Sequence, residues 1–288
     1  MKQAQINSQV AEGILKSINI PPCPEVVMAL MAEARQPEVE FAKLVKLISG
    51  DVSLAASMLK AANSPFFALR NKVNSIQQAV SVLGLKNLMQ IVTGSALHNA
   101  LEGDKVTMER FWDRSNSTAV VASLLASRLH GVSREDAYTL GLFHDCGIPI
   151  LMQKFPDYKD ILGAANQSAE LVIAIEDKHY STNHAVVGNM LAHSWFLPEH
   201  ISHAIQVHHD HTIFTYPDDR ATPAICVLVA ITLVAEHIAV VSMGMEDDAE
   251  WHVIGQVAQD YLGLSPEDMA EITEDALAEL EEIRSYRN

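Results

Sequence analysis

The sequence predicts an all-α protein, and three of its features lead to that prediction. Apolar residues make up 49% of the chain and aromatic residues only 6%, so the core would consist mainly of aliphatic and methionine side chains. These residues recur three or four positions apart, the spacing that places them on one face of a helix. Proline, glycine, serine and asparagine separate the periodic stretches, which is typical of short connections between helices.

The length and charge of the chain bound its organisation and its partners. A chain of 288 residues has room for one large or two modest domains. We expect an N-terminal helical bundle over residues 1–105, packed on a second helical domain over 106–288. The net charge of −16 argues against nucleic acid as a partner, because phosphate binding needs clustered Lys and Arg. Residues 246–288 carry 13 acidic residues and two Arg, a net charge of −11, and we expect a solvent-exposed helical face there.

Cysteine usage and the N-terminus point to the cytoplasm. The three cysteines are far apart and form no Cys-x-x-Cys pair, which fits a reducing compartment without a zinc knuckle. The N-terminus is polar and lacks the apolar core of a secretion signal. The apolar stretch over 222–245 is similar to a membrane span, but its uninterrupted part is short, and Glu236 and His237 interrupt it. We therefore expect a buried helix and no membrane partner.

Five helices joined by short connections are expected in the first hundred residues. Asp51 and Ser75 are suited to cap the third and fourth helices, and Gly84 is suited to end the fourth. Asn63-Ser64-Pro65 stops the third helix, because a proline ring disfavours helical backbone at the residue before it. The five helices are expected over 24–36, 40–48, 52–62, 76–83 and 86–100.

An adjacent histidine and aspartate, His144 and Asp145, follow an apolar helix in the second half of the chain. Ser133 is suited to cap that helix and Gly147 to stop it, so the pair would lie at the helix end. An imidazole and a carboxylate together suit a divalent transition metal. Further helices are expected over 111–129, 148–155, 169–180, 223–241 and 249–262, and others begin at His184, Pro198 and Ser265. Ser168 and Thr222 are suited to cap the helices over 169–180 and 223–241.

Four motifs in the first half follow one another in the order found in a known family. They are Ile20-Pro21-Pro22-Cys23-Pro24, Leu47-Ile48-Ser49-Gly50-Asp51-Val52-Ser53-Leu54, Ala62-Asn63-Ser64-Pro65-Phe66-Phe67 and Ile76-Gln77-Gln78-Ala79-Val80-Ser81-Val82-Leu83-Gly84. In this run the chain resembles the HDOD family, with Val52 and Phe67 in place of the usual proline and tyrosine. The resemblance implies an all-α module of bacterial signalling that works mainly by binding.

The second half of HDOD proteins resembles the HD-type phosphohydrolases, whose first metal-binding histidine lies in a Trp-x-His-Ser setting. This chain has Trp112-Asp113-Arg114-Ser115, so Arg114 stands at the position of that histidine. A guanidinium stays protonated and has no lone pair for a metal. We therefore expect Arg114 to pair with Asp145 or Glu236 and to fill the site with positive charge.

Eight of the thirteen histidines fall within 179–211, a density that overall composition does not explain. The resemblance to the related HD-GYP phosphodiesterases places His184, His208 and His209 at ligand positions. It places Glu236 where Asp or, in many HDOD proteins, Asn is usual. The other histidines of this stretch that we expect at the surface or at helix caps are His193, His200, His203 and His211.

The resemblance thus gives a candidate ligand set for one iron, manganese or zinc ion, in which Asp145 is also the candidate catalytic carboxylate. Without an ion, the alternative is a buried polar cluster whose imidazoles and carboxylates satisfy one another. Lys178 and Arg114 are the candidate cations for holding a phosphate. The candidate metal ligands are His144, Asp145, His184, His208, His209 and Glu236.

Three functions fit these residues. We expect foremost a cytoplasmic regulatory protein that binds a protein partner of a signalling pathway, with an HD-like site that has lost catalysis. The alternative is a metal-dependent phosphohydrolase acting on a nucleotide or another phosphoester. The third is a metal- or nucleotide-sensing module without turnover. The C-terminal helix that begins at Ser265 either packs its apolar face on the body or docks a partner, and we expect packing.

Overall fold

The computed structural model describes residues 12–67, 72–101, 105–165, 170–215, 221–245 and 249–287. Within these ranges the chain forms α-helices and two short 3-10 helices, and it contains no strand. The all-α prediction is confirmed. The expected start of one helix at Ala169, with Ser168 as its cap, lies outside the described residues, and that helix is observed from Val172.

The chain forms two compact units, and each unit draws on two separate parts of the sequence. The larger unit comprises the described residues of Met1–Pro21 and Gly103–Ala276. The smaller unit comprises those of Pro22–Glu102 and Leu277–Asn288. The expected boundary between residues 105 and 106 lies close to one of these divisions. The segment before Pro22 and the segment after Ala276, however, each belong to the unit formed by the other half of the chain.

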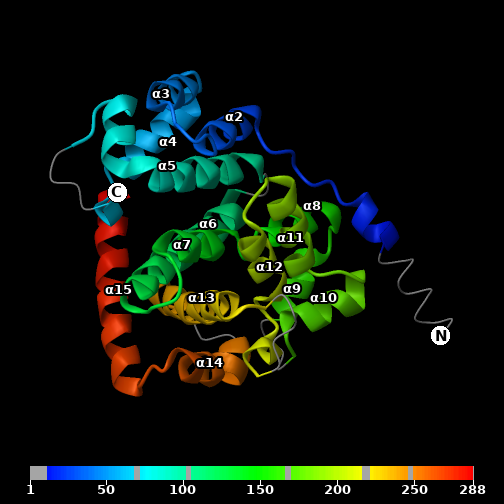
Figure 1. Cartoon of the computed structure of the whole chain (residues 1–288). Helices are drawn as coiled ribbons and strands as arrows, with labels where there is room; N and C mark the ends of the chain where they lie inside the picture. Colours follow the sequence, from blue (N-terminus) through cyan, green and yellow to red (C-terminus); the bar gives the residue numbers. More distant parts are fainter. Residues whose placement is uncertain are drawn as a thin grey trace. The chain divides into compact units, whose positions relative to one another are not determined.

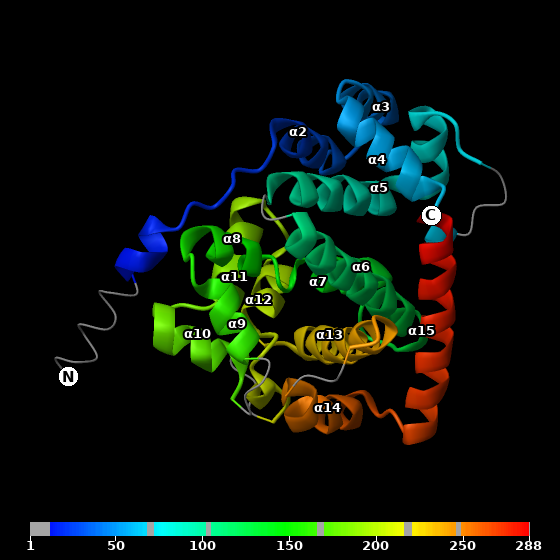
Figure 2. The ribbon, with the colours of Figure 1, turned by 180° about the vertical axis from the view of Figure 1, so that it is seen from behind.

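The smaller unit is built on four helices of the first hundred residues, which are visible in Figure 2. The side chains of Asp51 and Ser75 accept the N–H groups of Leu54 and Gln78, so both predicted caps are confirmed. Gly84 has a φ of 71°, in the left-handed region, and it breaks the last helix at the place where an end was predicted. The elements of this unit are α2 (Glu25–Ala34), α3 (Phe41–Ser49), α4 (Val52–Ala62), η1 (Pro65–Phe67), α5 (Ile76–Ala100) and the end of α15 (Pro266–Arg287).

Asn63 connects the end of α4 to the segment that leads into α5. Its side-chain amide donates to the carbonyl oxygens of Leu59 and Val73, each at 2.8 Å. Its side-chain oxygen accepts the N–H of Val73, also at 2.8 Å. Asn63 therefore lies at the end of α4, as predicted, and its side chain also holds the backbone of Val73, ten residues further on.

The larger unit contains the helices of the second half of the chain. They are α6 (Lys105–Arg128), α7 (Arg134–Phe143), α8 (Gly147–Lys154), α9 (Tyr158–Ala165), α10 (Val172–Tyr180), α11 (His184–Ser194), α12 (Glu199–Val207), η2 (His211–Phe214), α13 (Pro223–Ser242), α14 (Ala249–Leu262) and the first part of α15 (Pro266–Arg287).

Helix α13 forms the centre of the larger unit. It contacts α6, α7, α12 and α14, and Figure 1 shows it between α7 and α14. Thr222 caps it by accepting the N–H of Ile225, as predicted. Buried side chains occupy nearly every position from Ile225 to Val240, which is the pattern of a helix surrounded by others.

Two helices, α5 and α13, are long and apolar enough to cross a membrane, judged by length and composition alone. Helix α13 reaches this length, 20 residues, only by including Glu236 and His237, the two residues expected to interrupt the apolar stretch. The most apolar window of α13 is 78% buried inside the protein, however, so the expectation of a buried helix is confirmed.

The first part of α15 packs on the larger unit. Ser265 and Asp268 cap each other, since the Ser265 hydroxyl accepts the Asp268 N–H and the Asp268 carboxylate accepts the Ser265 N–H. Arg128 of α6 forms an ion pair with Asp275. Ile272, on the expected apolar face, is buried. The expectation that this face packs rather than remains free is confirmed for this part of the helix.

Close approaches between helices occur at small residues. A Cβ atom added at Gly141 of α7 would lie 2.8 Å from the Cα atom of Ala119 of α6. A Cβ atom added at Gly147 of α8 would lie only 2.0 Å from the carbonyl oxygen of His184 of α11. Gly147 was predicted to stop the preceding helix, and that prediction is wrong. It is the first residue of α8, and it is glycine because α11 passes too close for a side chain.

Candidate metal centre

Buried polar side chains from several helices meet in the interior of the larger unit. Two of them, His144 and Asp145, occupy the turn between α7 and α8, and Ser133 caps α7 as predicted by accepting the N–H of Asp136. His184 is the first residue of α11, whose cap is Asn183. This His–Asp cluster comprises six buried residues, His144, Asp145, His184, His208, His209 and Glu236, together with the partly exposed Arg114.

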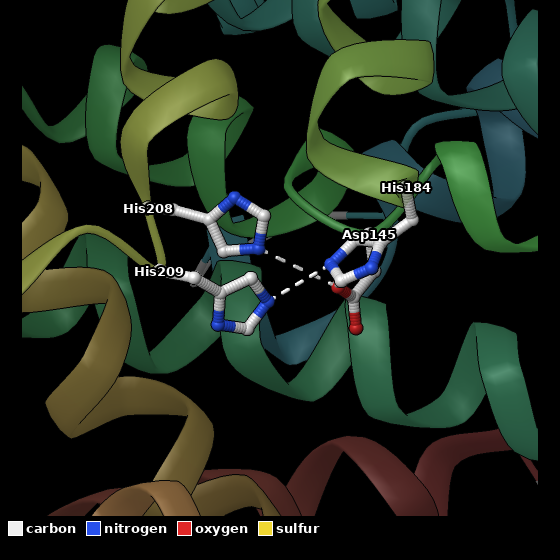
Figure 3. A group of neighbouring side chains, drawn as sticks. All are labelled: Asp145, His184, His208 and His209. Atoms are coloured by element: carbon white, nitrogen blue, oxygen red, sulfur yellow. Dashed lines mark hydrogen bonds and ion pairs between the residues drawn. The ribbon is translucent and has the colours of Figure 1, made fainter. Parts of the chain in front are cut away.

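One part of the cluster, the three-histidine group, consists of Asp145, His184, His208 and His209 (Figure 3). One ligand atom of each residue lies within 4.8 Å of the others. The Nε2 atoms of His184 and His208 lie 3.4 Å and 3.7 Å from Asp145 Oδ1. The Nε2 atoms of His184 and His209 are 2.8 Å apart.

The other part, the arginine-filled group, consists of His144, Asp145, Glu236 and the guanidinium of Arg114. His144 Nε2 lies 3.3 Å from Asp145 Oδ2 and 3.8 Å from Glu236 Oε1. Arg114 Nη2 lies 3.5 Å from Asp145 Oδ2 and forms a close ion pair with Glu236. The prediction that Arg114 reaches Asp145 or Glu236 is confirmed, since it reaches both.

Two of the cluster histidines are oriented by backbone carbonyls. His144 Nδ1 lies 2.8 Å from the carbonyl oxygen of Gly141, and His208 Nδ1 lies 2.7 Å from that of Ile205. A carbonyl can only accept, so Nδ1 carries the proton in both rings. The Nε2 atom of His208 therefore presents its lone pair to the three-histidine group.

The other two histidines are oriented by carboxylates that the sequence analysis did not single out. His184 Nδ1 lies 2.8 Å from Glu176, and the same carboxylate accepts the backbone N–H of His184 and the hydroxyl proton of Tyr158. His209 Nδ1 lies 2.6 Å from Glu250. Glu176 is on α10 and Glu250 on α14, so each ring is held by a helix other than its own.

The short contact between His184 and His209 requires a proton between the two rings, because two bare lone pairs would repel. Burial lowers the pKa of His209 to about 4. Burial also disfavours charge on His184, but the Glu176 carboxylate outweighs it and the pKa of His184 is raised. A proton shared between these Nε2 atoms, and held mainly by His184, accounts for the 2.8 Å contact.

The charges of the arginine-filled group balance one another. Burial opposes ionisation, but the charges of His144 and Arg114 outweigh it, so the pKa values of Asp145 and Glu236 are lowered. Burial likewise opposes a charged His144, but Asp145 and Glu236 raise the pKa of that imidazole to about 10. Two cations thus face two carboxylates, so the charges of this group balance, although His144 Nε2 makes no hydrogen bond among the described residues.

The three-histidine group fits a metal ion, whereas the arginine-filled group does not. His208 Nε2 is buried and has no hydrogen-bond partner among the described residues. A buried polar atom in that state is rare in proteins unless a ligand or water completes it. Three imidazole nitrogens and a carboxylate oxygen suit zinc, iron or manganese. In the arginine-filled group, the protonated guanidinium lies on the carboxylates that an ion would need.

A cavity of about 60 Å³ opens beside the three-histidine group. It has room for several water molecules or a small anion. Polar residues of the cluster contribute to its lining, among them Arg114 and His209, and so does Glu250. The remaining lining comes mainly from apolar side chains of α8, α9 and α10, including Ile148 and Leu162.

The other predicted residues lie outside the cluster. Lys178 is exposed on α10 and pairs with Glu170, which lines the cavity; its part in holding a phosphate stays a prediction. The expectation that His203 is a surface or cap residue is wrong, because it is only 3% exposed. It lies in α12, which packs against α7, α11 and α13. The remaining histidines of that expectation, His193, His200 and His211, are at least partly exposed.

Comparison with protein families identifies two thirds of the chain. The HDOD domain family model matches residues 20–211. This range contains the four motifs on which the resemblance rests, and it ends just after His209. The resemblance to the HDOD family is therefore confirmed.

Curated relatives are distant and longer than this chain. A protein of Treponema pallidum (strain Nichols), described as uncharacterized, is 26% identical over 206 residues, which cover 70% of this chain and 40% of that protein. The cyclic di-GMP phosphodiesterase CdgJ of Vibrio cholerae serotype O1 is 24% identical over 155 residues, which cover 51% of this chain and 35% of CdgJ. The chain thus matches less than half the length of either relative.

Solved structures share the fold over nearly all of the chain. An HDOD domain protein of unknown function from Geobacter sulfurreducens superposes with a TM-score of 0.73 at 24% identity. The superposition covers 98% of this chain and 97% of that one. At this identity the likeness shows a common all-α fold, and the chemistry of the site rests on the residues described above.

Proposed function

We propose that this chain, which belongs to the HDOD domain family, is a regulatory protein of bacterial signalling that acts by binding and not by turnover. One observation carries the proposal. The guanidinium of Arg114 lies on Asp145 and Glu236, where the HD-type phosphohydrolases that this half resembles use a histidine ligand.

The substitution removes a requirement of metal-dependent hydrolysis. Such a reaction needs an ion that polarises a phosphoryl oxygen and an activated water that attacks the phosphorus. An arginine has no lone pair for an ion, and it stays protonated at any physiological pH. The arginine-filled group therefore contributes a fixed charge in place of an exchangeable ligand site.

The cavity beside the cluster also favours binding without turnover. Arg114 lines it, but the guanidinium is already engaged by two carboxylates. Asp145 and Glu170 add negative charge to the same lining. A phosphoester entering the cavity would meet these acidic groups with little positive charge to offset them.

The proposed partner is a protein of the same signalling pathway, and the proposed location is the cytoplasm. The family resemblance supports the first point. The cysteines support the second, because Cys23, Cys146 and Cys226 are all free and buried, as suits a reducing compartment.

A metal-dependent phosphohydrolase is the second candidate, and the three-histidine group favours it. That group retains three imidazoles and a carboxylate on rigid helix ends. The match to CdgJ, a cyclic di-GMP phosphodiesterase, covers 35% of that protein and also points to this candidate. A bound ion would supply Lewis-acid activation there, while Glu176 and Glu250 would hold two of the ligand rings in position.

A turnover screen decides between the two candidates. The full chain, loaded in turn with zinc, manganese and ferrous iron, is incubated with a phosphomonoester, a phosphodiester and cyclic di-GMP. We expect no product above the rate of the Asp145→Asn variant prepared in the same way. Turnover by the unsubstituted chain that is lost in Asp145→Asn would overturn the proposed function and establish the second candidate.

A further inference from the structure

We infer that Arg114 takes the place of a second cation, so that this chain holds a single divalent ion in the three-histidine group. The inference rests on the proposed function in one respect, the assignment of Arg114 as a permanent occupant of the arginine-filled group. It goes further by giving the ion count and by assigning the ion to one of two overlapping ligand groups.

The two oxygens of Asp145 divide the cluster. Oδ1 faces His184 and His208, at 3.4 Å and 3.7 Å. Oδ2 faces His144 and Arg114, at 3.3 Å and 3.5 Å. One carboxylate thus bridges two adjacent sites for positive charge, and the guanidinium lies at only one of them.

The three-histidine group keeps a complete ligand set on its side of Asp145. The Nδ1 atoms of His184, His208 and His209 all have a hydrogen-bond partner outside the group, namely Glu176, the carbonyl of Ile205 and Glu250. With the outer nitrogen of each ring held in this way, the inner nitrogens converge on one centre. His208 Nε2, which is buried without a hydrogen bond, has the lone pair that an ion would use.

The arginine-filled group has no room for a further ion. Arg114 bonds Glu236 directly and lies against Asp145 Oδ2, which are the two anionic ligands on that side. A second divalent ion would have to displace the guanidinium and would then lie close to both it and the first ion. Repulsion between like charges at such distances in a buried site is large. The guanidinium is held in this place by α6, whose backbone packs directly on α7 at Gly141.

Metal counting tests the inference without any assay of activity. The full chain is dialysed to equilibrium against buffered Zn²⁺, and bound zinc per chain is measured by mass spectrometry. We expect one ion in the unsubstituted chain and one in Arg114→Lys, which keeps the positive charge. We expect two in Arg114→His, because that change removes the fixed charge and supplies an imidazole lone pair to Asp145 and Glu236.

Two further variants assign the ion without relying on Arg114→His to fold. His208→Ala removes a ligand of the three-histidine group and should weaken zinc binding by more than about 100-fold, beyond the effect of losing an outer partner. His144→Ala belongs to the arginine-filled group and should leave one ion bound. Circular dichroism of each variant checks that the helices remain. Loss of the ion in His144→Ala with retention in His208→Ala would reverse the assignment.

The outcomes separate this inference from the proposed function. Two ions in the unsubstituted chain, no ion at all, or a single ion in a folded Arg114→His variant would each overturn the inference. Failure to find any ion leaves a non-catalytic binding protein intact. A single ion accompanied by phosphoester turnover overturns the proposed function and leaves the ion count standing.

Discussion

At the scale of single residues, the cluster shows how much depends on one substitution. An imidazole at position 114 could share its lone pair with an ion, whereas the guanidinium of Arg114 competes with the ion for Asp145 and Glu236. Asp145 and Glu236 therefore pair with the guanidinium, whereas the second oxygen of Asp145 faces the three-histidine group. The resemblance to the HD-type phosphohydrolases predicted this pairing, because it placed Arg114 among the candidate ligands, where a guanidinium can pair with carboxylates but cannot bind an ion.

The residues that orient the ligands were not predicted. Glu176 and Glu250 lie 8 residues before His184 and 41 residues after His209, and their helices meet the cluster only through packing. Tyr158, which bonds Glu176, comes from a third helix. No local sequence motif indicates that a glutamate orients a ligand, because a glutamate on a helix is most often exposed to solvent. Their burial is what distinguishes them.

Replacing Glu176 tests the role of these outer partners. In Glu176→Gln the uncharged amide holds the His184 ring less firmly and lowers its basicity, so we expect zinc affinity to fall by about 10- to 100-fold. Competition with a chelator of known affinity measures the change. Glu199→Gln is the matched control, because Glu199 is exposed on α12 and should leave the affinity unchanged. Equal affinity in the two variants would show that Glu176 does not support the ligand.

The pH dependence of zinc binding follows from the proton on His184. The raised pKa of His184 means that its proton is present at low pH and is lost as the pH rises. An ion needs that lone pair, so affinity should increase with pH, by about tenfold per pH unit where one proton is released. The pKa values of His208 and His209 are lowered to about 4, so these rings stay neutral near pH 7. Burial raises the pKa of the Glu250 carboxyl beside His209 to about 8, so loss of its proton adds to the same rise in affinity. Calorimetry in buffers of different ionisation enthalpy counts the released protons, and a count of zero would contradict this account.

At the scale of helices, the sequence predicted caps well and contacts between helices poorly. Ser133, Thr222, Asp51 and Ser75 all cap the helices they were expected to cap, because a cap depends on residues three positions away. The close approach at Gly147 depends on α11, almost forty residues later, and was misread as a helix stop. Helix caps can be predicted from the sequence because they depend on near neighbours along the chain, whereas contacts between helices far apart in the sequence cannot.

The approach at Gly147 has a direct consequence for the cluster. It brings α8 against the start of α11, and so it sets the distance between Asp145 and His184. In Gly147→Ala the new Cβ would collide with the backbone carbonyl of His184, so we expect a loss of about 3 kcal/mol or more in the free energy of unfolding. Gly163→Ala in α9 is the matched control. A Cβ there meets nothing within 4 Å, and helix propensity favours alanine by up to about 1 kcal/mol. Urea titrations of the two variants should therefore shift in opposite directions.

At the scale of the whole molecule, the six candidate ligands and Arg114 all belong to the larger unit. The smaller unit has a core of its own, with Leu30, Leu44 and Met58 fully buried. The Asn63 side chain there connects two backbone segments, and the groups of possible metal ligands found among the described residues lie in the larger unit. The motifs that identify the family lie mostly in the smaller unit, whereas the chemistry lies in the larger one. A family resemblance built on the first half therefore predicts the fold better than it predicts the site.

Because the candidate ligands all lie in the larger unit, we expect bound zinc to protect that unit more than the smaller one. An ion that binds only the folded chain stabilises it by mass action, by about 2.7 kcal/mol when free zinc exceeds the dissociation constant 100-fold. Amide hydrogen exchange should slow around the cluster, in peptides from the α7–α8 turn, the start of α11 and the end of α12. Exchange in α2 to α4 should change least, because these helices supply no ligand. His208→Ala should abolish the slowing while leaving exchange in α2 to α4 as before. Equal slowing throughout the chain on addition of zinc would show that the ion acts on both units together.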